Sequence, residues 1–83
     1  MAVKVVEVNI NKVTDVQEFC RKALQSEAKI TMKSDTWRIN GKSLLGLFSI
    51  DLGKPVTVEV EHADEKVVDA FIESVSGLVI EGA

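Results

Sequence analysis

Four short stretches of the chain alternate apolar with polar residues, and no other feature of the sequence restricts the possible folds so strongly. The clearest stretch runs from Val56 to Glu61, where three valines alternate with Thr57, Glu59 and Glu61. Similar alternation is found over residues 6–10, 28–33 and 37–39. A period of two places the apolar side chains of a strand on one face and the polar ones on the other. The sequence therefore predicts strands that are buried on one face, and helices that all cover that face.

The segments between these stretches predict the order of the elements. Apolar residues at helical spacing follow the first strand, a short apolar run follows the third, and a last helical stripe follows the fourth. The predicted order is strand, helix, strand, strand, helix, strand, helix, which is an α+β open-faced sandwich. With 83 residues we expect a single domain over residues 1–83. The apolar tail Leu78-Val79-Ile80 is expected either to pack back on this domain or to pair with another chain as a strand.

The first helix has a recognisable start and an apolar stripe. Thr14-Asp15-Val16-Gln17 reads as a capping box, with Thr14 as the N-cap. The apolar residues that share one face of this predicted helix are Val16, Phe19, Cys20, Ala23 and Leu24. Cys20 is the only cysteine of the chain and lies on that stripe, so we expect a buried structural thiol.

The middle of the chain is predicted to hold a hairpin and a short helix. Ser34-Asp35 supplies turn residues, and Trp37 on the strand that follows is expected to pack in the core or at its rim. Ser43 is expected to cap the second helix, which Gly53 and Pro55 should end.

The last helix is expected to begin after an Asp64 N-cap and to run to about residue 76. Gly77 suits the left-handed C′ position of that helix. The helix also has an acidic row with a spacing of four residues, which is typical of a solvated face: Glu65, Asp69 and Glu73.

Composition excludes several classes of function. The net charge is −3 and no basic cluster alternates with aromatic residues, so we expect no nucleic-acid binding. No run of 18 apolar residues is present, and the N-terminal segment is no signal-peptide core, so we expect no membrane association and a cytoplasmic location. There is no metal-ligand spacing, no glycine-rich phosphate loop and no paired-carboxylate arrangement. We therefore expect no metal, no cofactor and no enzymatic activity.

One segment resembles a known family. The run Ile39-Asn40-Gly41-Lys42-Ser43-Leu44-Leu45-Gly46-Leu47-Phe48-Ser49 is similar to the stretch around the regulatory serine of HPr, the histidine-containing phosphocarrier of the phosphotransferase system. Val56-Thr57-Val58 and Ala63-Asp64-Glu65 are similar to the family's fourth strand and the start of its last helix. The order of elements agrees over essentially the whole chain. The resemblance implies a four-stranded antiparallel sheet in the order 1-4-2-3, with three helices on one face.

The same resemblance reveals a departure. The family's phosphocarrier motif is His-Ala-Arg-Pro at the start of the first helix, and this chain has Lys12-Val13-Thr14-Asp15 there. A phosphocarrier needs a neutral ring nitrogen to attack phosphorus. Lys12, with an unperturbed pKa of about 10.4, is protonated at neutral pH, and Asp15 adds a carboxylate where a phosphate would lie. We therefore predict no catalytic residue and a chain that is not competent as a histidine phosphocarrier.

His62, the only histidine, is expected to be structural or simply exposed. It lies where the fourth strand leads into the last helix, beside Glu61, Asp64 and Glu65. These carboxylates would repel a phosphate, so we do not expect His62 to be a relocated acceptor.

The resemblance implies two sites on the second helix. Ser43 would be the target of regulatory phosphorylation by a protein kinase, and otherwise a helix cap only. Leu44 and Leu45, at least partly exposed, and Phe48 would form a surface for protein partners, whereas Leu47 should be buried. We therefore expect a regulatory or protein-binding role with partners from the phosphotransferase system. The alternatives are a phosphocarrier with a non-standard acceptor residue, and a structural or small-ligand-binding module on the same scaffold.

Overall fold

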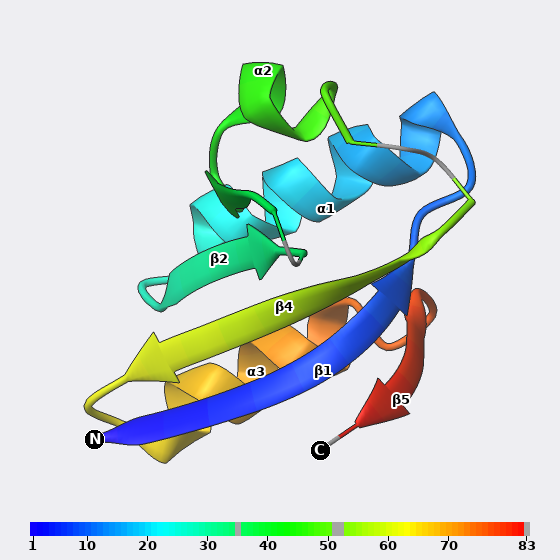
Figure 1. Ribbon diagram of the computed structural model, residues 1–83. Helices are drawn as coiled ribbons and strands as arrows, with labels where there is room; N and C mark the ends of the chain where they lie inside the picture. The colour runs from blue at the N-terminus through cyan, green and yellow to red at the C-terminus, as the bar shows by residue number, and fades with distance from the viewer. Residues whose placement is uncertain (35, 51–52, 83) are drawn as a thin grey trace.

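The chain forms a sheet with helices packed on one of its faces (Figure 1), and the computed structural model describes residues 1–34, 36–50 and 53–82. The strands are β1 (Ala2–Asn9), β2 (Lys29–Lys33), β3 (Arg38–Asn40), β4 (Pro55–His62) and β5 (Val79–Gly82). The helices are α1 (Val13–Gln25), α2 (Leu44–Leu47) and α3 (Glu65–Ser74). Helices α1 and α3 cover the same face of the sheet, and α2 packs against α1 and β3. The predicted turn residue Asp35 lies outside the described residues.

The sheet is antiparallel throughout and has the order β3-β2-β4-β1-β5. Its first four strands follow the expected order 1-4-2-3. The longest ladder joins β1 to β4 over eight residue pairs, from Ala2 opposite His62 to Asn9 opposite Pro55. This ladder pairs Val6 with Val58, so the apolar positions of both strands share one face.

The expected number of strands was wrong, because the sheet has five strands and not four. The apolar tail supplies the additional one: β5 pairs antiparallel with Val6, Glu7 and Val8 of β1. Of the two expectations for this tail, packing back on its own domain is the one that the structure supports. The backbone N–H of Asn9 also donates to the Leu78 carbonyl (2.9 Å), which fixes the entry of the chain into β5.

The core lies between the inner face of the sheet and the helices. Its apolar members come from all the strands except β5 and the short β3, and from every helix: Val6, Val8, Ile10, Val16, Phe19, Cys20, Ala23, Ala28, Ile30, Met32, Leu47, Ile50, Val56, Val58, Val60, Val68, Phe71 and Val75. Trp37 and Ile39 are half-buried against this cluster, as expected for the rim. Leu24 is an exception to the predicted stripe of the first helix, because it is exposed.

The start of α1 differs from the capping-box prediction. The N-cap is Lys12 and not Thr14, which lies within the first turn. Asp15, and not Thr14, provides the side-chain acceptor: its Oδ2 accepts from the backbone N–H of Asn11 (3.2 Å). The helix therefore begins two residues earlier than predicted, and its first turn contains a carboxylate, which the positive end of the helix dipole favours.

The ends of the other two helices also differ from prediction. Helix α2 ends at Leu47, well before Gly53 and Pro55, because the chain turns through hydrogen bonds from the N–H of Ser49 to the Gly46 carbonyl and from Ile50 to Leu47. Gly53 has φ +86° and lies in the connection to β4, where its N–H donates to the Ile10 carbonyl (2.8 Å).

Helix α3 begins as predicted, with Asp64 Oδ1 accepting from the backbone N–H of Lys66 (2.9 Å). Its end does not use Gly77 in a left-handed conformation, since the only glycine with positive φ among the described residues is Gly53. Instead the chain continues in right-handed turns, in which the N–H of Leu78 donates to the Val75 carbonyl (2.9 Å).

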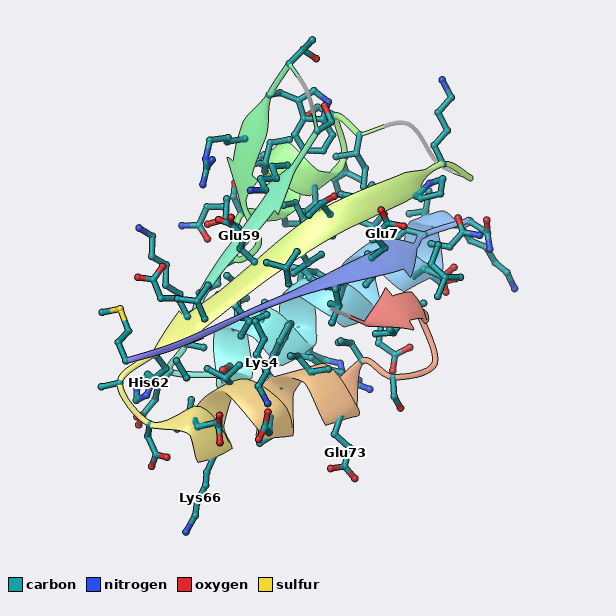
Figure 2. The ribbon with its side chains drawn as sticks, turned by 60° about the horizontal axis from the view of Figure 1, so that its bottom comes forward. Lys4, Glu7, Glu59, His62, Lys66 and Glu73 are labelled. Carbon is teal, nitrogen blue, oxygen red and sulfur yellow. The ribbon has the colours of Figure 1, made fainter. Side chains whose placement is uncertain are left out.

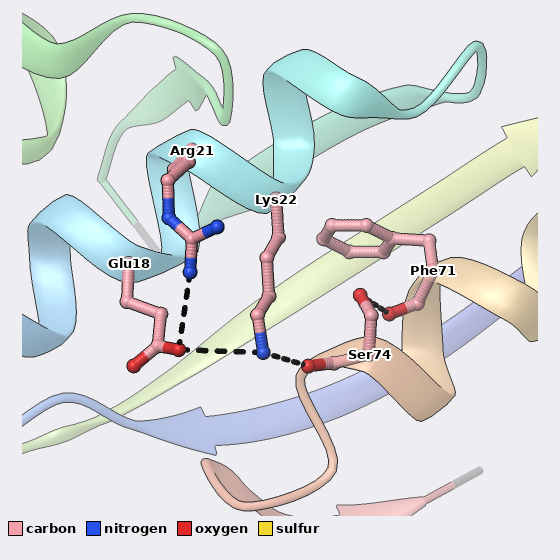
Figure 3. Close-up of polar contacts among 5 residues, drawn as sticks. All are labelled: Glu18, Arg21, Lys22, Phe71 and Ser74. Carbon is pink, nitrogen blue, oxygen red and sulfur yellow. Dashed lines mark hydrogen bonds and ion pairs between the residues drawn. The ribbon is translucent and has the colours of Figure 1, made fainter.

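Lys22 of α1 connects the two long helices (Figure 3). Its Nζ donates to the carbonyl of Ser74 at the end of α3 and lies 3.4 Å from Glu18 Oε1. A cation at a helix C-terminus is favoured by the helix dipole. In the core, the ring of Phe19 from α1 and the ring of Phe71 from α3 meet edge to face, with centroids 5.6 Å apart. Polar and aromatic contacts together hold α1 against α3.

The outer face of the sheet has a cluster of charges centred on Glu59. Its carboxylate accepts from Lys33 Nζ and, at 3.1 Å, from Arg38 Nη2. The hydrogen bond from Lys33 is the main cause that holds the pKa of Glu59 below its ordinary value of 4.5. The charges of β2 and β4 are thus complementary. Lys33 reaches Glu59 diagonally, because the residue directly opposite Lys33 is Thr57.

No helix in the described part of the chain is long and apolar enough to cross a lipid bilayer.

The pKa of Glu59 predicts a pH-dependent contribution to stability. Because this pKa is lowered in the folded state, the stabilisation is complete above the ordinary value of 4.5 and is lost as the pH falls through the folded value. Glu59→Gln should lower the free energy of unfolding at pH 7 and have little effect at pH 3, as measured by urea denaturation at both pH values. In a Lys33→Met/Arg38→Met background the same substitution should lose its pH dependence. An equal effect of Glu59→Gln at both pH values would contradict this assignment.

Candidate functional site

Two charged residues, Lys12 and Asp15, lie at the N-terminus of α1. Lys12, the N-cap, has extended backbone angles (φ −136°, ψ 159°), an exposed side chain and no side-chain capping hydrogen bond. Asp15 accepts from the N–H of Asn11 and so places a carboxylate at the first turn. An anion approaching the free amides of this helix would meet that carboxylate. The structure therefore places a lysine side chain and a carboxylate, and no imidazole, at this helix start, which is only a weakly favourable setting for a phosphate.

His62 lies far from this helix start. It is the last residue of β4 and is opposite Ala2, whereas α1 begins just beyond the other end of the β1–β4 ladder. At a rise of about 3.4 Å per residue, the two ends of this ladder are roughly 24 Å apart. Figure 2 shows His62 beside the start of β1 and of α3. Its Nδ1 accepts from the backbone N–H of Asp64 (2.9 Å), and its Nε2 is 3.9 Å from Glu27 Oε2, which agrees with a structural role.

Ser43 is the N-cap of α2, as predicted. Its Oγ accepts from the backbone N–H of Gly46 (3.2 Å), and its carbonyl accepts from the N–H of Leu47 (2.9 Å). The side chain of Ser43 is exposed. A hydroxyl in this position serves the fold and is also accessible to another protein.

Two contacts to α1 fix the segment just ahead of Ser43. The Cys20 thiol donates to the Lys42 carbonyl (3.7 Å), and Lys42 Nζ donates to the Ser26 carbonyl at the end of α1 (2.8 Å). Cys20 is buried, as expected, but its contact with Lys42 is a role that its place on an apolar stripe did not predict. The amine of Lys42 is held by Ser26, so it does not lie free beside the Ser43 hydroxyl.

Close packing requires glycine on both sides of Ser43. A Cβ on Gly41 would lie 2.5 Å from Ile30 Cγ2, and one on Gly46 would lie 2.7 Å from Ile39 Cγ2. Carbon atoms cannot approach so closely without displacement. The glycines of the Gly41-to-Gly46 segment therefore let α2 sit directly against the β2–β3 hairpin.

The apolar residues of α2 divide into a buried and an exposed set. Leu47 is fully buried in the core, whereas Leu45 is 86% exposed, Phe48 45% and Leu44 41%. The expected exposure of Leu44 and Leu45 and the expected burial of Leu47 are confirmed. The exposed side chains bury little apolar area when the chain folds, so they contribute little to stability. Packing of the core therefore gives no reason for apolar residues at these exposed positions.

A groove of about 360 Å³ continues this surface onto α1. It is lined by Gln17, Cys20, Arg21, Leu24, Gln25 and Leu44. Leu24, Arg21 and the two glutamines were not predicted as site residues. A signal was present for Leu24, because at about 100° per residue it lies roughly 80° from Val16, at the margin of the apolar stripe. We refer to Leu24, Leu44, Leu45 and Phe48 as the α1–α2 apolar surface.

The structure thus brings Ser43 and the α1–α2 apolar surface together and leaves His62 at the other end of the sheet. No group of three His, Cys, Asp or Glu side chains that could hold a metal ion occurs within residues 1–34, 36–50 and 53–82.

Comparison with known proteins agrees with this geometry. A family model described as the PTS HPr component phosphorylation site matches residues 6–78. The crystal structure of a phosphocarrier protein HPr from Bacillus anthracis strain Ames is 23% identical, with a TM-score of 0.66, over 89% of this chain and 98% of that one. HPr-C-His from Thermoanaerobacter tengcongensis is 19% identical, with a TM-score of 0.69, over 93% of each chain. At these identities the two structures show a shared fold. A sequence comparison with curated proteins gave no match.

Proposed function

Since the chain belongs to the HPr family of the phosphotransferase system, we propose that it is a cytoplasmic protein that acts by binding other proteins of that system, without carrying a phosphoryl group on a histidine. The observation that carries this proposal is the opening of α1, where Lys12 is the N-cap and Asp15 supplies a carboxylate. Phosphoryl transfer requires a lone pair on a neutral nitrogen at that place. An ammonium group has none.

A phosphocarrier that uses a different acceptor is the first alternative. His62 is a poor candidate, because its Nδ1 already accepts from Asp64 and its Nε2 faces Glu27. Cys20 is buried and its thiol contacts the Lys42 carbonyl, so it is not open to attack on a phosphoryl donor. The imidazole and the thiol of the chain are thus engaged or inaccessible, which favours a binding role.

The α1–α2 apolar surface supports a protein partner. Leu44, Leu45 and the C-cap Phe48 are exposed, and Leu47 is the residue of α2 that is buried in the core. The neighbouring groove adds Leu24 and the guanidinium of Arg21 at its margin. An apolar centre with a polar margin is the usual composition of a protein interface. The alternative of a structural or small-ligand module gives no reason for these side chains to face water.

Ser43 provides a means of regulating this surface. It directly precedes Leu44, and a phosphate on its Oγ would meet the free amides of the first turn of α2. The helix would therefore tolerate the modification, while two negative charges would be added at the border of an apolar interface. We propose that phosphorylation of Ser43 alters partner binding in this way.

The first experiment tests for a phosphoryl group. Incubation with phosphoenolpyruvate and the general phosphotransferase enzyme should leave the intact mass of the protein unchanged, because Lys12 cannot act as the nucleophile. An HPr that retains its histidine provides the positive control. Acid-labile phosphate on this chain would overturn the proposal, and peptide mapping would then identify the acceptor.

The second experiment tests the binding surface, with the same enzyme as the partner. Leu45→Ser should weaken the complex by about tenfold in isothermal titration calorimetry, the loss typical of an exposed apolar side chain at the centre of an interface. Its unfolding midpoint should be unchanged, because Leu45 contributes little to the core. Ile80→Ser, which alters an exposed apolar residue on β5, is the matched control. Equal affinities of the two variants, or no binding by the wild type, would contradict the proposed surface.

The third experiment concerns Ser43. A serine-directed HPr kinase should modify the wild type on one site and leave Ser43→Ala unmodified, as measured by phosphopeptide mass analysis. Ser49→Ala removes a second exposed serine of the same segment and should be phosphorylated normally. Modification that persists in Ser43→Ala would show that the kinase uses another residue.

A further inference from the structure

Strand β1 has an edge that β5 covers only in part. On one side β1 pairs with β4 over its full length, but on the other side β5 reaches only Val6, Glu7 and Val8. Residues 2–5 of β1 have no strand partner on that second side within the described parts of the chain. Backbone N–H and C=O groups left open along an edge are a template for an incoming strand.

A groove lies directly beside this open edge, on the helix side of the sheet. It has a volume of about 390 Å³ and is lined by residues of β1, α3 and β5 and of the turn between them: Lys4, Val6, Asp69, Ile72, Glu73, Ser76 and Val79. Val6, Ile72 and Val79 are its apolar lining residues, and the other four are polar or charged. Figure 2 shows Lys4 extending from β1 toward α3, with Glu73 farther along the same helix.

The charge of this region is negative. Lys4 Nζ forms an ion pair with Asp69 and also interacts with Glu65, and Glu73 follows Asp69 by four residues on the same helix. Glu73, exposed at the groove margin, forms no ion pair within the described residues. The charged residues that line the groove are one lysine and two acids, Lys4, Asp69 and Glu73, and this excess of negative charge favours a basic occupant.

A second copy of the chain would be a poor occupant. Antiparallel pairing of two β1 edges about a two-fold axis would bring the same surface of each copy together. The acidic rows of the two α3 helices would then lie on the same side of the joined sheet and repel each other. A different chain, with basic residues, avoids this repulsion.

We propose that the open edge of β1 binds an extended, basic segment of a partner protein as an additional strand beside residues 2–5. Main-chain hydrogen bonds to β1 would hold the segment, as in other cases of strand addition. Alternate side chains would enter the groove, where the aliphatic part of a lysine or arginine packs on Ile72 and its charge meets Glu73. The remaining side chains would face water beside Val3, which is exposed. This edge is at the opposite side of the sheet from α2, so it is independent of the surface proposed above.

Synthetic peptides test the proposal on the full chain. The probe is a seven-residue capped peptide, Thr-Lys-Thr-Val-Thr-Lys-Thr, and its acidic counterpart has Glu in place of Lys. The basic peptide should shift the amide resonances of residues 2–5 and slow their hydrogen exchange. The acidic counterpart should bind at least tenfold more weakly. Absence of binding at millimolar basic peptide, or shifts confined to α1 and α2, would overturn the proposal.

Two further comparisons separate strand addition from simple charge attraction. A strand added at an edge uses every second amide, so N-methylation of one alternate set should abolish binding while methylation of the other set is tolerated. Glu65→Lys/Glu73→Lys should weaken binding at least tenfold, whereas Glu27→Lys, an equally exposed acidic position on another segment, should not. Equal binding of both methylated peptides would overturn strand addition. A peptide-free dimer with protected β1 amides would assign the edge to a second copy and overturn the basic partner.

Discussion

The antiparallel ladder between β1 and β4 is the constraint on which the rest of the structure depends. It pairs residues along the full length of both strands, with Val6 opposite Val58 and Val8 opposite Val56, and so commits one face of each strand to the core. A shift by one residue would expose these valines and bury Glu59. The same register decides where chemistry can occur. It puts the start of α1 at one end of the sheet and His62 at the other. No local rearrangement can bring this histidine to the site that the family uses, because the whole ladder separates them.

The parts of the fold that could be predicted from the sequence are those that periodicity determines. The alternation in β1, β2 and β4 and the caps at Ser43 and Asp64 each depend on residues close together in the chain. The errors arose where a distant or competing contact decides. Thr14 has the right chemistry for a cap, but Asp15 bonds to Asn11 and starts α1 earlier. The apolar pattern of the tail at Val79 is compatible both with packing on its own domain and with pairing to another chain. It pairs within the chain because β1 has an edge that β4 does not cover. Likewise, the groove beside Leu44 needs α1 and α2 to meet, which no local pattern encodes.

The two surfaces proposed to bind partners lie at opposite edges of one sheet. Helix α2 packs against β3 and α1, whereas the groove beside Lys4 is formed by β1, α3 and β5. Their chemistry differs as well: the first is apolar with Arg21 at its margin, and the second is acidic. Since the core and the full sheet separate them, occupation of one does not block the other sterically. If both proposals hold, the chain would join two different proteins without any change in its own fold.

Positions 12 and 43 correspond to the phosphoacceptor histidine and the regulatory serine of the family. The fold restricts the choice of residue more at position 43 than at position 12, so the two residues differ in what they indicate about function. Lys12 is exposed and makes no side-chain capping hydrogen bond, so helix capping does not require a particular side chain at this position. Ser43 caps α2 and would be favoured by the fold even if no kinase ever modified it. Its presence is thus weak evidence for regulation by itself. The exposure of Leu45 is different, because an apolar side chain in water adds nothing to stability and tends to promote aggregation. The exposure of Leu45 and its neighbours therefore supports the proposed protein-binding role more strongly than the presence of Ser43 does.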